Sequence, residues 1–411
     1  MKDMHYWSVA ETAAHLSRGD VSVRDVTEAQ FARIAQVNPQ IKAITTVVDE
    51  AMDVARVLDQ AGRPQDAGPL WGVPVTVKIN VDHKGYANSN GVLANKDAIA
   101  DADSPVVRNL KDAGAVIAAR TSTPEFSMRW FTSNPIHGVS LNPWDHRVTP
   151  GGSSGAAAAA VACGIGAIGH GNDLGGSLRY PAMCCGVATN RLSLGRIPAM
   201  NPAQSAAGIE RGPFTQLMAV QGPIGRSIAD VRDPLWVPAP VSPRDVGGPL
   251  RVGYAMNPFQ GKLDPAVQMA IEKAIAGFKD AGAKLREISP PSAAELPDLW
   301  GTLMFTETEA LARGAMEANA SEEMWDYYQK FLGHFETADM AGLMRALQRR
   351  IVLQRAWAAM FQEVDVLLLP TSLSRPFRND QDFKEPETLG EIVAAQSPLL
   401  AINVLGLPSV A

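Results

Sequence analysis

The 411-residue sequence has little of several features that mark particular protein classes. It has three cysteines, Cys163, Cys184 and Cys185, without C-x-x-C spacing, which argues against a disulfide framework and a thiolate zinc site. Basic residues are outnumbered, 37 against 43 acidic, and the net charge of −6 argues against a nucleic-acid partner or an anionic membrane surface. The sequence has no apolar run of about 18 residues and no signal-peptide pattern. We expect free thiols, a soluble cytoplasmic protein, and no bound metal.

What the sequence does contain is an alternation of helical and strand patterns. Ser8 and Ser22 stand at helix N-cap positions, with Glu11 and Asp25 three residues later as capping-box partners. A further helix is expected over about 49–61, and the alternating apolar residues from Val73 to Ile79 predict a strand. The segment 104–122 adds a helix, a glycine stop and a strand, which is typical of an α/β sheet.

The pattern predicts one α/β domain over 1–411 with a helical elaboration. We expect N-terminal helices in 1–65, a core in 66–230, a variable and mostly helical region in 231–362, and a return to the sheet in 363–411. A helix that begins at Ser227 should break at Pro234, and the sequence stops inside an apolar strand pattern. We therefore expect that residues are missing near 231–234 and after 411.

The stretch TPGGSSGAAAAAVACGIGAIGHGNDLGGSLRYP (149–181) combines glycines and serines and invites several interpretations. Gly164, Gly166 and Gly169 match the dinucleotide pattern G-x-G-x-x-G. That motif works where a strand runs into a helix, whereas here a helix is expected before it and a strand after it. A phosphate-binding loop of the G-x-x-x-x-G-K-[ST] type is absent from the sequence.

A serine hydrolase with a histidine base is a second interpretation. GGSSG places Ser153 in the pattern G-x-S-x-G, ahead of an alanine-rich helix over about 154–163. The preceding NPWDHRVTP is a poor strand, although the motif requires one. Only His170 and His334 follow Ser153, and neither stands in a loop composition that suggests a base.

A third interpretation starts from the glycines before Ser177. Gly175 and Gly176 lack β-carbons, so successive amide groups there can converge on an oxyanion beside the Ser177 hydroxyl. Such a serine needs a base within hydrogen-bond reach. Lys78 ends the apolar strand, where burial would lower its pKa and favour the neutral amine. By its position alone, Lys78 could equally reach the surface or pair with a carboxylate.

The combination resembles the amidase signature family of serine hydrolases. The matching segments, which run in order along nearly the whole chain, are GVPVTVKIN (72–80), TSTPEF (121–126), NPWDHRVTPGGSSG (142–155), GNDLGGSLRYPAMCCG (171–186) and LGRIP (194–198). The resemblance implies an amidase signature fold, in which helices flank both faces of a large mixed β-sheet. It further implies amide hydrolysis without a cofactor.

The resemblance also implies roles for particular residues. Ser177 would be the nucleophile, Ser153 the bridging serine with a cis peptide bond, and Lys78 the base. The oxyanion hole would use the amides of Leu174, Gly175, Gly176 and Ser177. Three further residues would support the site, namely Ser154, Asp173 and Arg179.

Several positions depart from the family's commonest pattern: Ile79 after the lysine, Ser122, Ala156, Asn172 and ATNRLSLGRIP. They weaken any inference about the acyl group, so a small or aryl carboxamide is expected, with an ester or carbamate (urethanase) as variants. Pocket walls are expected near 128–131 and 296–340. Two alternatives are an amidotransferase subunit that releases ammonia from glutamine, and a non-catalytic binding module. We expect a monomer or homodimer.

Overall fold

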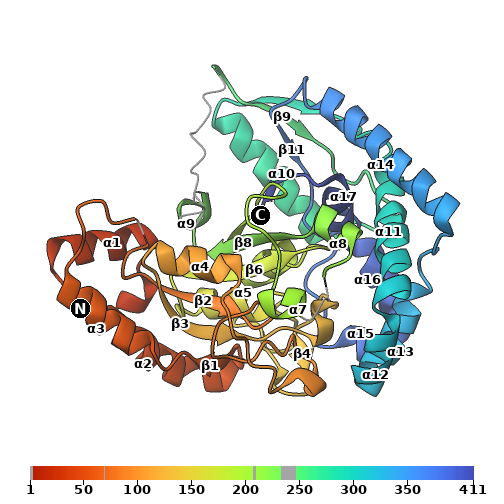
Figure 1. The fold of residues 1–411 in the computed structure, drawn as a ribbon. Coiled ribbons are helices and arrows are strands. Elements are labelled where there is room, and N and C mark those ends of the chain that lie inside the picture. The colour runs from red at the N-terminus through yellow and green to blue at the C-terminus, as the bar shows by residue number, and fades with distance from the viewer. Residues whose placement is uncertain (1–2, 69, 207–209, 233–246) are drawn as a thin grey trace.

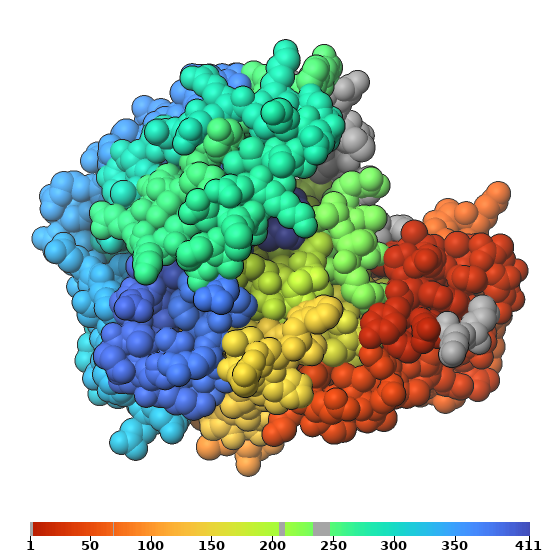
Figure 2. All heavy atoms as spheres, turned by 180° about the vertical axis from the view of Figure 1, so that it is seen from behind, coloured from red at the N-terminus to blue at the C-terminus, as the bar shows by residue number. Residues whose placement is uncertain are grey.

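The structure is a computed structural model that describes residues 3–68, 70–206, 210–232 and 247–411. The N-terminal helices and the C-terminal part of the chain lie on opposite sides of the molecule, with the glycine-serine stretch between them (Figure 1, Figure 2). The central element is a mixed seven-stranded sheet in the order β1-β3-β2-β6-β8-β7-β12. Its strands are β1 (Ile44–Val47), β2 (Pro74–Lys78), β3 (Val116–Thr121), β6 (Ile168–Asp173), β7 (Ala188–Arg191), β8 (Val220–Gly225) and β12 (Ser409–Val410).

The N-terminal helices begin where the sequence predicts. Ser8 and Ser22 form capping boxes with Glu11 and Asp25, because each serine accepts from the third helical amide and each carboxylate accepts from the serine amide. These caps begin α1 (Val9–Arg18) and α2 (Val23–Ile41), and α3 (Ala51–Ala61) follows. Helix α2 packs against β1, β2 and β3, and α4 (Pro105–Asp112) packs against β3.

Strand β2 carries Lys78 into the middle of the protein. It lies between β3 and β6 and pairs in parallel with both. All five of its residues are buried, as expected of a parallel strand covered on both faces. Its last side chain therefore emerges at the carboxyl edge of the sheet without reaching bulk water.

The alanine-rich helix α5 (Gly155–Ala162) lies in the core, and Gly155 through Val161 are buried. A helix that is apolar on every side is stable only where protein surrounds it, and α5 packs against β2, β3, β6, β8 and α6 (Arg179–Cys185). Gly164, Gly166 and Gly169 lie between α5 and β6 or inside β6. This order is the reverse of a dinucleotide site, as the sequence predicts.

A second sheet has three parallel strands, in the order β10-β9-β11: β9 (Arg251–Tyr254), β10 (Lys284–Glu287) and β11 (Val366–Leu368), with α10 (Pro265–Asp280) joining the first two. The prediction that 363–411 returns to the main sheet is thus largely wrong, because β11 joins this separate sheet. The sequence predicts a strand in the terminal stretch 402–411, but residues 402–405 belong to helix α17 (Ser397–Leu405), because a short buried apolar run does not distinguish a helix from a strand. Only β12 returns to the main sheet, antiparallel to β7.

The region between 294 and 362 is helical, as predicted: α11 (Leu296–Leu311), α12 (Arg313–Asn319), α13 (Glu322–Leu332) and α14 (Met340–Met360). Ser227 accepts from the Asp230 amide at the start of α9 (Ile228–Arg232), and the expected break at Pro234 lies outside the described residues. Within the described ranges, no single helix is long and apolar enough to cross a membrane. The bent pair Pro386–Ala395 and Ser397–Leu405 passes that test by length and composition together.

Candidate active site

The amine of Lys78 has three polar contacts in the protein interior. Its Nζ lies 2.7 Å from Ser153 Oγ, 3.1 Å from Ser154 Oγ and 2.9 Å from Asn172 Oδ1. The side chain has no solvent exposure. Burial, which costs the charged form its hydration, lowers the pKa of Lys78 well below the ordinary lysine value, and the opposing attraction of Asp173 is smaller. Burial therefore favours the neutral form of the amine.

The neighbours of Lys78 decide where its lone pair points when it is neutral. The Asn172 oxygen can only accept, so it takes one N–H of the amine. Ser154 Oγ accepts the second N–H at 3.1 Å. The lone pair then remains for the hydroxyl proton of Ser153, which is the nearest of the three groups. This arrangement is compatible with proton transfer from Ser153 to a neutral Lys78.

Ser153 and Ser154 immediately precede α5, yet neither side chain caps the helix. Ser154 is the N-cap residue and makes no side-chain capping bond. Both hydroxyls instead face Lys78. The Gly152–Ser153 peptide bond is cis, as the resemblance implies.

Ser177 follows the loop after β6 and lines the same cavity as Ser153. Its residue surface is 9% exposed. Its carbonyl accepts from the Ser154 amide at 3.2 Å, which holds the two serine-bearing loops together. The Ser177 hydroxyl forms no hydrogen bond to any residue that the structure describes, so it is available to a molecule in the cavity.

The loop Leu174–Ser177 is held by two tryptophans. Trp300 Nε1 donates to the Leu174 carbonyl at 2.9 Å, and Trp130 Nε1 donates to the Gly175 carbonyl at 2.8 Å. Because the N–H and C=O of a planar trans peptide point in opposite directions, these bonds also orient the amides of Gly175 and Gly176.

One member of the expected oxyanion hole needs correction. The Gly176 amide donates to Asp173 Oδ1 at 2.9 Å, so it is not free for an oxyanion. The side chain of Asp173 lies below the loop, where its carboxylate accepts this hydrogen bond. The amides of Leu174, Gly175 and Ser177 have no partner among the described residues. Gly176 is required for another reason, since its φ is 100° and a Cβ would lie 2.4 Å from Leu399 Cδ1.

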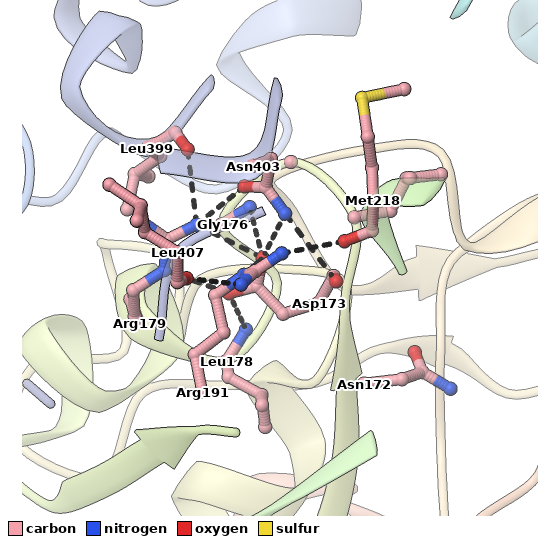
Figure 3. A network of polar contacts seen from close by, with 12 residues as sticks. Asn172, Asp173, Gly176, Leu178, Arg179, Arg191, Met218, Leu399, Asn403 and Leu407 are labelled. Carbon is pink, nitrogen blue, oxygen red and sulfur yellow. Dashed lines mark hydrogen bonds and ion pairs between the residues drawn. The ribbon is translucent and has the colours of Figure 1, made fainter. Parts of the chain in front are cut away.

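Asp173 is the centre of a buried network below the loop (Figure 3). Arg179 donates to both carboxylate oxygens at 3.0 Å, and Asn403 Nδ2 donates at 2.9 Å. Burial alone would raise the pKa of Asp173, but the guanidinium of Arg179 and the charge of Arg191 lower it far below the ordinary value. Asp173 and Arg179 thus position the loop Leu174–Ser177. The side chain of Asn172, the residue before Asp173, points away from this network (Figure 3).

Residues that sequence reasoning did not place in the site are Asn80, Asn172, Trp130 and Trp300. Asn80 and Asn172 pair through their side-chain amides, with Asn172 Nδ2 donating to Asn80 Oδ1 at 2.9 Å. Asn172 stood out only as a departure from the family pattern, and its adjacency to Asp173 did not reveal that it contacts Lys78. Trp130 and Trp300 fall within the stretches expected to form pocket walls, 128–131 and 296–340, but the sequence did not indicate that they hold the loop before Ser177.

His170 is not part of the cavity. It lies on β6, its Nδ1 accepts from the Lys78 amide at 3.4 Å, and its Nε2 is 2.8 Å from Gln221 Oε1. Burial lowers the pKa of His170 to about 4, so the ring is neutral and structural. The interpretation with a histidine base receives no support from this geometry.

The cavity in front of Ser177 has a volume of about 330 Å³. One wall is apolar and combines Met128 with residues of the helical region, Met304, Leu311, Ala312 and Met316. These positions fall in the two stretches expected to form pocket walls. A second, more polar set of lining residues comes from 201–204 and 210–219 and was not anticipated: Asn201, Gln204, Glu210, Arg211 and Thr215.

The chain is similar to known proteins along nearly its whole length. A family model described as Amidase matches residues 25–411. Indoleacetamide hydrolase from Bradyrhizobium diazoefficiens is 41% identical over 419 residues, covering 98% of this chain and 79% of that protein. Acylamidase from Rhodococcus erythropolis is 31% identical over 400 residues, covering 92% and 81% respectively. A solved fatty acid amide hydrolase has a TM-score of 0.85 at 24% identity, covers 99% of this chain and 73% of that one, and is similar in fold.

Proposed function

The chain belongs to the amidase signature family and hydrolyses carbon–nitrogen bonds of small non-peptide amides, and we propose that Lys78, Ser153 and Ser177 carry out this reaction. The observation on which the proposal rests is the 2.7 Å contact between the buried Lys78 amine and Ser153 Oγ, beside Ser177 in one cavity. A neutral amine there is a base, and a serine hydroxyl between it and the nucleophile is a proton relay.

The proposed reaction begins with proton transfer. Lys78 accepts the Ser153 hydroxyl proton, Ser153 accepts the Ser177 proton, and Ser177 Oγ attacks the amide carbonyl carbon. Ser177 and Ser153 share no hydrogen bond within the described structure, and contacts of this kind tighten when substrate binds. The carbonyl oxygen of the substrate becomes an oxyanion, for which the amides of Leu174, Gly175 and Ser177 are the proposed donors.

Collapse of the tetrahedral intermediate breaks the carbon–nitrogen bond. The proton held on Lys78 returns through Ser153 to the leaving amine, and an acyl group remains on Ser177 Oγ. Water then attacks the acyl carbon, with its proton taken up by the same relay, and releases the carboxylate. No residue changes oxidation state, and every proton removed in the first half is returned.

The cavity supports a small or aryl acyl group. Its volume of about 330 Å³ is at the lower end for small-molecule sites, and Phe126, Met128 and Met304 provide apolar contact area for a ring or short alkyl chain. Ester and carbamate hydrolysis, a monomeric or homodimeric state, a cytoplasmic location and a single domain over 1–411 remain predictions.

A panel of amides tests the proposal with purified protein and Ser177→Ala as the control. We expect turnover of phenylacetamide or a similar small amide without added protein partners, and its loss in Ser177→Ala. Undiminished turnover in Ser177→Ala would remove Ser177 from the mechanism. Hydrolysis of glutamine alone, dependent on added partner chains, would favour the amidotransferase alternative, and no turnover of any amide or ester would favour a binding module.

A further inference from the structure

Arg211 lines the cavity in front of Ser177, and its guanidinium has no partner among the residues that the structure describes. Other interior arginines are tied to acceptors. Arg129 pairs with Asp382 at 2.6 Å, Arg179 with Asp173 at 3.0 Å, and Arg226 donates to the Gly166 carbonyl at 3.0 Å. Arg211 is thus a cation in the wall of the site that forms no ion pair with any residue that the structure describes, although the charge of Asp82 acts on it from a distance.

The carboxylates around Arg211 are already committed or lie outside. Glu307 accepts from the Phe214 and Thr215 amides and from Thr215 Oγ1. Asp82, whose charge acts on Arg211, accepts from Asn88 Nδ2 at 2.7 Å and from the Ala203 amide at 2.8 Å. Glu210 lines the rim and is exposed, and it forms no ion pair with Arg211 within the described structure.

The position of Arg211 is electrostatically costly without an anion. Burial is the largest influence on its pKa and lowers it, because the guanidinium has lost part of its hydration. Its charge also contributes, after burial, to the lowered pKa of Lys78, so it acts within reach of the reacting groups. A partly desolvated cation with no partner is strongly stabilised by an anion that enters the same cavity.

We propose that Arg211 binds a carboxylate of the substrate, so that the preferred substrates carry a carboxylate in addition to the amide that is cut. The inference rests on the proposed function and names the substrate class of the same site. A guanidinium presents a planar fork of donors that matches the two oxygens of a carboxylate. The apolar wall with Met304, Leu311 and Met316 would cover the carbon chain or ring between the amide and the carboxylate.

Matched substrates test the proposal with the wild-type protein. Pentanamide, glutaramide and glutaramate differ at one end, which is a methyl, an amide or a carboxylate. N-propionylethylamine and N-propionylglycine place the exchange of methyl for carboxylate on the leaving group. In at least one series we expect kcat/KM for the acid to exceed that of the neutral amide about 10- to 100-fold, the range of a charge-assisted contact. Preference for the neutral amide in both series would overturn the proposal.

Substitutions locate the effect. Because Arg211 also helps to lower the pKa of Lys78, the quantity compared is the ratio of kcat/KM for the acid to kcat/KM for the neutral amide. Arg211→Gln should abolish the excess of this ratio, mainly through a higher KM for the acid, while Arg211→Lys should keep part of it. Glu210→Gln is the matched control at the rim and should leave the preference intact. An equal loss on acid and neutral substrates in Arg211→Gln would assign Arg211 a structural role and overturn the proposal.

Binding of glutarate to Ser177→Ala protein, measured by calorimetry, makes the test independent of turnover. We expect binding that weakens about tenfold or more when Arg211→Gln is added. Equal affinity with and without Arg211 would contradict the inference even if all amides are hydrolysed. Failure of the proposed function is recognised separately, as turnover that survives Ser177→Ala.

Discussion

Asn172 Oδ1 accepts a hydrogen bond from Lys78 Nζ at 2.9 Å. The acceptor is an uncharged amide, so it orients the lysine without stabilising the protonated form as a carboxylate would. The pairing of Asn172 with Asn80 holds the amide in this orientation. Asn172 thereby positions the Lys78 amine, while burial lowers its pKa.

Replacing Asn172 by aspartate should change the pH dependence of the reaction. The pKa of Lys78 is lowered in the folded protein, so the active neutral amine forms as pH rises through that value. A carboxylate at position 172 favours the charged amine and raises the pKa of Lys78 by about 1–3 units. The acidic limb of kcat/KM against pH should move upward by a similar amount. Asn172→Ser is the uncharged control, and an unmoved limb in Asn172→Asp would exclude Lys78 as the base.

Trp300→Phe should lower kcat more than it changes KM. The substitution removes the indole donor to the Leu174 carbonyl and leaves the loop before Ser177 less well oriented. We expect a loss of about tenfold in kcat and about 1 kcal/mol in the free energy of unfolding. Trp71→Phe is the control, because Trp71 is buried in the N-terminal cluster and its indole N–H donates to no group in the described structure. Equal effects of both substitutions on kcat would contradict the positioning role.

Asp173→Asn should destabilise the fold strongly. It leaves the Arg179 guanidinium buried beside a neutral group, and breaking a buried ion pair costs about 3–5 kcal/mol. Because the folded pKa of Asp173 is lowered, its contribution is present above the ordinary aspartate pKa and is lost as pH falls below about 4. Urea unfolding at neutral pH measures the loss. Asp365→Asn, at an exposed pair with Arg251, should have little effect.

His170 should make stability fall as the solution is acidified from neutral pH. Its folded pKa is about 4, whereas an unfolded histidine has a pKa of about 6.5, so the unfolded chain binds more protons between these values. Across that interval the free energy of unfolding should drop by about 3 kcal/mol from this group. Unfolding measured from pH 7 to pH 4 should show a steeper slope for the wild type than for His170→Gln. Identical slopes would mean that His170 is not buried as a neutral ring.

Local sequence was sufficient for the elements that depend on local signals. The capping boxes at Ser8 and Ser22 formed because their side chains bond to amides three residues away. The strand that ends at Lys78 followed from its apolar run, and the glycine-serine stretch indicated both serine loops. The terminal stretch 402–411 was partly misjudged, since residues 402–405 are helical and apolar character alone does not distinguish a buried helix from a buried strand.

The sequence by itself determined that this chain has the α/β pattern, the serines at 153 and 177 and the lysine at 78 of a family of amide hydrolases. The tertiary structure decided that Asn172 and Ser154 accept hydrogen bonds from the Lys78 amine. It also decided that the Gly176 amide donates to Asp173 and that Arg211 lines the cavity without an ion-pair partner among the described residues. Several contacts of the site join segments far apart in the chain, such as Lys78 with Asn172 and Trp300 with Leu174. Contacts of that kind depend on how strands and helices pack, and no periodicity along the chain records them.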